Sequence, residues 1–114
     1  MMRIDPAVFG ASREALRDAL EAEGVPCSAG YGYSLPDQPL FRNKAFGPFL
    51  PAARERIDYG AMRCPNSDRL CREQALWLGQ NLLLGTDADV DDIVMAFEKI
   101  HALRDALTAL GPSR

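Results

Sequence analysis

The chain has 114 residues, of which 47% are hydrophobic and 25% charged, and its formal net charge is -3. This length supplies one hydrophobic core, so we expect a single domain spanning residues 1–114. The net acidic charge gives no electrostatic footprint for nucleic acid, so no nucleic-acid partner is expected. No apolar run approaches the roughly 20 residues of a membrane-spanning helix. The first residues lack the apolar core of a signal peptide, so we expect a cytoplasmic location.

The first predicted element is a helix that starts at Ser12 and ends at Gly24. The Ser12 hydroxyl can accept a hydrogen bond from a free N–H group of the opening turn. Leu16, Ala19 and Leu20 recur with helical period, which makes their face the core side. Glycine readily adopts the left-handed conformation that ends many helices, so Gly24 predicts the C-terminus.

The middle of the chain predicts extended and irregular structure. A short strand is expected at 25–28 and another near 57–62. Between them, residues 34–51 hold four prolines, which remove backbone donors and favour an ordered loop or a sheet edge. The prolines and the aromatic residues among them are Pro36, Pro39, Phe41, Phe46, Pro48, Phe49 and Pro51.

The second half predicts helices around one strand. Pro65 suits the first position of a helix that runs to about Glu73, because this position needs no backbone donor. Residues 75–78 indicate a strand, and residues 80–84 a helical turn closed by Gly85. Short strands between helices predict an α+β fold, a two-layer sandwich.

The last predicted helix is the longest. Thr86 and Asp89 have the spacing of a capping box, with Asp in place of the usual Glu. A continuous apolar stripe then extends to the stop at Gly111-Pro112. Its members are Val90, Ile93, Phe97, Ile100, Leu103, Leu107 and Leu110.

The order of short motifs along the chain resembles the C-terminal part of the DegT/StrS family of aminotransferases, from about Phe9 to Leu110. The motifs are Gly24, Gly30-Tyr31, Pro39-Leu40-Phe41, Cys64-Pro65, Trp77-Leu78, Leu83-Leu84-Gly85 and the segment 93–100. Two positions depart from the family pattern: Ser34 stands where the family often has proline, and Pro36 where it often has an aromatic residue or histidine.

The resemblance implies the small domain of a fold type I enzyme that aminates keto-sugars or cyclic ketones with pyridoxal phosphate (PLP). In this family a lysine of a large domain holds the cofactor. The expected partners are therefore that large PLP-binding domain or a companion chain, and a nucleotide-sugar or cyclic ketone substrate. The small domain borders the substrate cleft, which makes Tyr31 and Tyr33 the candidate substrate-binding residues. The alternative is that both tyrosines only pack the loop.

No residue of this chain is expected to be catalytic. Lys44 and Lys99 are its only lysines, and neither has the sequence surroundings of a cofactor lysine, so no PLP should bind the chain alone. The alternative function is a stand-alone, non-catalytic binding or scaffold module with the same fold. Exposed aromatic residues of the loop, Phe41, Phe46 and Phe49 with the two tyrosines, predict self-association of the isolated chain.

No metal site is expected either. Asp87, Asp89, Asp91 and Glu98 match four positions of a calcium loop, but Asp92 occupies the position that requires glycine. Helical period continues through the segment, and acids in a first turn are explained by the helix dipole. The wide spacing of the cysteines and the single histidine disfavour a disulfide framework and a zinc site. These residues are Cys27, Cys64, Cys71 and His101.

Overall fold

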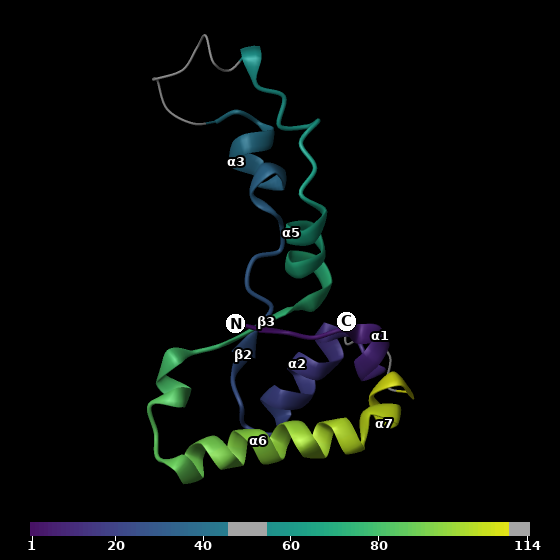
Figure 1. Cartoon of the computed structure of the whole chain (residues 1–114), viewed down its shortest axis with the longest axis vertical. Helices are drawn as coiled ribbons and strands as arrows, with labels where there is room; N and C mark the ends of the chain where they lie inside the picture. The colour runs from purple at the N-terminus through teal and green to yellow at the C-terminus, as the bar shows by residue number, and fades with distance from the viewer. Residues whose placement is uncertain (46–54, 110–114) are drawn as a thin grey trace. The chain divides into compact units, whose positions relative to one another are not determined.

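The computed structural model describes residues 1–45 and 55–109 (Figure 1). The chain divides into two compact units, Met1–Gly30 with Glu73–Arg114, and Tyr31–Arg72. Across the described ranges the fold is α+β, with six α-helices and a three-stranded antiparallel sheet. Within these ranges no helix combines the length and the apolar character that crossing a bilayer requires.

The sheet of the first unit is built from very short strands. β3 (Ala75–Leu78) lies in the centre, between β1 (Met2–Arg3) and β2 (Cys27–Ser28). Met2 pairs with Leu76, and Ser28 pairs with Trp77. The strands at 75–78 and within 25–28 were predicted, whereas β1 and the following helix α1 (Pro6–Phe9) were not. Two residues carry no readable alternation, so only the pairing with β3 identifies β1.

Helix α2 (Arg13–Ala22) confirms the first predicted helix. The Ser12 side chain accepts a hydrogen bond from the backbone N–H of Ala15 at 3.1 Å, which caps the first turn. Gly24 follows the last turn with φ +86°, the left-handed conformation expected of it. Leu16 and Leu20 are fully buried, so the predicted core face is the observed one.

The long C-terminal helix is interrupted, which corrects the prediction of one continuous stripe. α6 (Asp87–Ala102) ends at Leu103, and α7 (Arg104–Ala109) follows. Leu103 is exposed rather than part of the core. The Arg104 side chain donates a hydrogen bond to the carbonyl of His101 at 3.0 Å, which satisfies an acceptor at the helix end. The turn lets Leu107 pack on the core, and Leu110 lies outside the described residues.

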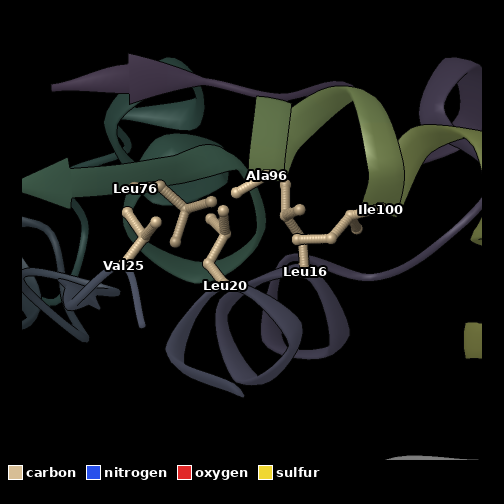
Figure 2. Packing of buried hydrophobic residues seen from close by; sticks show 6 residues of the cluster. All are labelled: Leu16, Leu20, Val25, Leu76, Ala96 and Ile100. Carbon is tan, nitrogen blue, oxygen red and sulfur yellow. The ribbon is translucent and has the colours of Figure 1, made fainter. Parts of the chain in front are cut away.

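The core of the first unit lies where α2, α6 and β3 meet. Figure 2 shows side chains from these elements and from the segment after α2 pointing toward one another. Burial of such aliphatic side chains is the main stabilising contribution in a domain of this size. The core cluster is Leu16, Leu20, Val25, Leu76, Ala96 and Ile100.

The second unit consists of two arms that run side by side (Figure 1). The first arm holds a 3₁₀ turn, η1 (Leu35–Asp37), and the short helix α3 (Pro39–Arg42). Both have proline in their first turn, so prolines that predicted a loop instead start helical turns. The expected strand near 57–62 is wrong, because these residues form turns. The second arm ends in α5 (Pro65–Arg69), which continues as a π-helical turn, η2 (Leu70–Gln74).

In the first unit, the helical turn that was predicted after the central strand is the 3₁₀ turn η3 (Gln80–Leu83).

Candidate functional site

The two candidate substrate-binding tyrosines lie at the start of the second unit. Tyr31 is 70% exposed and Tyr33 is 53% exposed. The backbone carbonyl of Tyr33 accepts a hydrogen bond from the Gln38 side chain at 3.2 Å, which fixes this stretch of backbone against η1. Both side chains therefore present much of their surface to solvent, on a segment whose backbone is held in place.

Ser34 connects this segment to the other arm of the unit. Its side chain is buried, and its hydroxyl donates a short hydrogen bond to the carboxylate of Asp68 in α5. The serine that departs from the family pattern thus has a structural role here. Because a buried hydroxyl without a partner is costly, the bond with Asp68 stabilises the join between the arms.

Asp37 is the centre of a three-residue ion cluster. Its carboxylate accepts hydrogen bonds from Arg42, with Nε at 3.1 Å, and from Nη2 of Arg72 at 2.9 Å. The hydrogen bond from Arg42, assisted by the charges of both arginines, lowers the pKa of Asp37 below its ordinary value. Arg42 belongs to the same arm as Asp37, and Arg72 to the other arm. The cluster was not predicted from the sequence, because 35 positions separate Asp37 from Arg72.

An aromatic pair joins the arms further along. The rings of Phe41 and Tyr59 lie with centroids 5.2 Å apart and tilted by 56°. Phe41, which was expected on an exposed aromatic face, is half-buried instead. Phe46 and Phe49, the other phenylalanines of that expected face, lie outside the described residues.

The two lysines do not fit a PLP site. Lys99 lies on α6, its side chain is 57% exposed, and its Nζ forms an ion pair with Glu23 at 2.8 Å. A Schiff-base lysine must become a neutral nucleophile, which burial favours and a nearby carboxylate opposes. Lys44 follows the end of α3 and has φ +51°, in the left-handed region. Because Lys99 is exposed and ion-paired, no step through the cofactor is derived for this chain.

A cleft of about 420 Å³ lies in the first unit, between the end of α2 and the start of α6. Three acids line it, and two of them are already engaged: Glu23 pairs with Lys99, and Asp89 accepts hydrogen bonds from the backbone and hydroxyl of Thr86. The lining residues are Glu23, Gly24, Val25, Asn81, Leu82, Gly85, Asp89, Asp92 and Ile93. The cleft therefore offers no nucleophile and no histidine for catalysis.

The residues of the rejected metal sites have other roles. Asp89 completes the predicted capping box of α6, in which its backbone N–H also donates to the Thr86 hydroxyl at 3.3 Å. The His101 ring contacts the Phe9 ring in a tilted arrangement, with centroids 5.6 Å apart. Burial raises the pKa of the Cys27 thiol, which keeps it in the neutral form. In the part of the chain that the structure describes, no group of three or more histidine, cysteine or acidic residues is arranged to hold a metal.

Comparison with curated proteins connects the chain to sugar aminotransferases. It is 32% identical over 117 residues to a Streptoalloteichus tenebrarius protein named "Putative L-glutamine:3-amino-2,3-dideoxy-scyllo-inosose aminotransferase", with 94% of this chain aligned. Proteins of the same name are 31% identical in Micromonospora echinospora and 27% identical in Streptomyces kanamyceticus, with 99% and 87% of the chain aligned. The chain spans only 25% to 27% of the length of these relatives.

The other comparisons add no relative. No protein-family model matches the chain, and no solved structure matches it. The similarity to part of three aminotransferases, all named for the same keto-inositol reaction, is thus the finding on which a functional assignment depends.

Proposed function

We propose that the chain is the C-terminal small domain of a PLP-dependent aminotransferase of the DegT/StrS type, which aminates a keto-sugar or a cyclic ketone. The observation that carries the proposal is the alignment of 94% of this chain with 27% of a keto-inositol aminotransferase. In this proposal a large domain, on the same or a companion chain, supplies PLP and its lysine. The chain alone is inactive and borders the substrate cleft.

The structure supports this division of labour through its site residues. Lys99 is ion-paired with Glu23 at the surface, which agrees with a cofactor lysine supplied by another domain. Tyr31 and Tyr33 are exposed on a segment held by Gln38, so their hydroxyl groups can donate hydrogen bonds to a hydroxylated ring. Positioning by hydrogen bonds is a role that needs no covalent chemistry from this domain.

A chimaera tests the proposal. Residues 1–114 replace the aligned segment of the Streptoalloteichus tenebrarius relative, and amination of 3-amino-2,3-dideoxy-scyllo-inosose by L-glutamine is measured. We expect activity well above that of the relative with the segment deleted, and below that of the intact relative. A chimaera that folds and binds PLP but does no better than the deletion would contradict the proposal and favour the stand-alone binding module.

The two tyrosines are tested in an active chimaera. Tyr31→Phe and Tyr33→Phe each remove one hydroxyl and keep the ring, so a lost hydrogen bond to substrate should raise KM by about tenfold. Tyr59→Phe is the matched control, because the Tyr59 ring packs on Phe41 within the unit. An unchanged KM in both variants would mean that the tyrosines serve packing.

A further inference from the structure

The second unit carries a charge opposite to that of the whole chain. Residues 31–72 hold seven of the 13 lysines and arginines but only four of the 16 acidic residues. The unit therefore has a formal charge of +3, although the chain as a whole is at -3. A cationic unit attracts anionic ligands, and it directs attention to the arginines that lie together in it.

Arg42 and Arg72 are brought together by one carboxylate. Asp37 engages Arg42 through Oδ1 and Arg72 through Oδ2, so both guanidinium groups lie within hydrogen-bonding distance of the same side chain. The single carboxylate of Asp37 balances only one of the two guanidinium charges, so the three-residue cluster has a net charge of one positive unit.

The two arginines form the outer part of the cluster. The side chain of Asp37 is 16% exposed, whereas those of Arg42 and Arg72 are 42% and 55% exposed. Asp37 uses Nε and Nη2 of Arg42 and Nη2 of Arg72. In the described residues, Nη1 of Arg42, which lies beside Gly60, and Nε and Nη1 of Arg72 are not used by Asp37 and are further donors of the cluster.

We propose that Arg42 and Arg72, oriented by Asp37, bind the oxyanion of a ligand, a carboxylate or a phosphate. The planar guanidinium fork matches the two oxygens of such a group, and these charge-assisted bonds are stronger than neutral ones. Asp37 holds both forks in place before the ligand arrives, which lowers the entropy cost of binding. The proposal does not depend on the aminotransferase assignment, because any protein that takes an anionic ligand can use such a site.

Titration of the purified chain tests the site directly. Inorganic phosphate and L-glutamate are added separately at constant ionic strength, and the side-chain Nε–H resonances of arginine are followed by NMR. We expect saturable shifts at Arg42 and Arg72 and weak, millimolar-range affinity. Tighter binding of phosphate would assign a phosphate-bearing ligand, and tighter binding of glutamate a carboxylate. Shifts of equal size at all arginines, without saturation, would overturn the proposal.

Two variants separate a built site from general charge attraction. Arg72→Lys keeps the charge but loses the fork, so it should weaken binding of the preferred anion by about tenfold. Arg69→Gln is the control: it removes a charge three residues away, where Arg69 bonds only Asn66, at 2.7 Å, in the described part of the unit. It should change binding by less than about twofold. The reverse order of effects would overturn the proposal, and an unchanged urea midpoint confirms that each variant is folded.

Discussion

The backbone of Gly30 lies against the indole ring of Trp77, so closely that a Cβ atom built on Gly30 would stand 2.2 Å from Nε1. Gly30 also has φ +67°, a conformation that residues with side chains rarely adopt. Trp77 belongs to β3 and pairs with Ser28, two residues before Gly30. The glycine is thus required twice, by its backbone conformation and by the ring beside it.

Gly30→Ala should lower the free energy of unfolding by about 3 kcal/mol, because it adds a steric clash to the strain of a left-handed residue. Gly24→Ala has the strain but open space around it, and should cost about 1 kcal/mol. Gly32→Ala has neither, so its effect should stay within about 0.5 kcal/mol. Urea unfolding measures all three. Equal losses at Gly30 and Gly24 would mean that Trp77 moves away without cost.

The capping box of α6 should make stability depend on pH in the acid range. The hydroxyl of Thr86, and then its backbone N–H, lower the pKa of Asp89. Because the pKa of Asp89 is lower in the folded than in the unfolded state, its ionisation stabilises the fold at pH values above the unfolded-state pKa, near 3.9. This stabilisation is lost as the pH falls through the folded-state pKa. Thr86→Ala should therefore destabilise the protein at pH 7, and its difference from the wild type should shrink below pH 4.

The control for the capping box is Asp91→Asn, which removes a charge two residues after Asp89 and leaves the box intact. Its effect on stability should be small at both pH 7 and pH 3. If Thr86→Ala destabilised the protein equally at both values, hydrogen bonding to the ionised Asp89 would not be the cause.

Calcium should not stabilise the chain. The Asp89 carboxylate already accepts two hydrogen bonds from Thr86, both at 2.7 Å, and is engaged in the helix cap. The melting temperature should be the same in millimolar calcium and in a chelator. A rise in calcium that Asp87→Asn with Glu98→Gln abolished would show a real calcium site.

PLP should form no stoichiometric adduct with the isolated chain. Lys99 is exposed and ion-paired with Glu23, so it does not lie in an enclosed cofactor site. After PLP titration and borohydride reduction, mass spectrometry should find only partial, scattered labelling. Lys99→Arg and Lys44→Arg identify the source of any label. One complete adduct that either substitution removed would contradict this prediction.

The isolated chain should self-associate through the second unit. Exposed apolar side chains recur along its sequence, and exposed apolar surface favours association. They are Tyr31, Tyr33, Leu35, Leu40 and Met62. Light scattering should show a mass that rises with concentration, and Leu35→Ser with Leu40→Ser should reduce this rise more than Val94→Ser with Met95→Ser on α6. A strictly monomeric wild type would argue for an independent module.

The helices α2 and α6 and the central strand β3 could be predicted from the sequence alone. Capping and termination are local chemistry, so Ser12 and Gly24 mark α2, and Thr86 with Asp89 marks the start of α6. The periodic burial of Leu16 and Leu20 follows from the same helix. These features depend on neighbours within four residues, which the sequence shows directly.

The remaining features depend on tertiary contacts between distant parts of the chain. β1 exists because Met2 and Arg3 pair with β3, more than 70 residues later in the chain. α6 ends at Ala102 instead of continuing, and Leu107 of α7 packs against the core. The joining of Asp37 to Arg72 depends on how two arms of the chain meet. Such contacts form between positions that are far apart in sequence, and their free energy depends on geometry that no local pattern records.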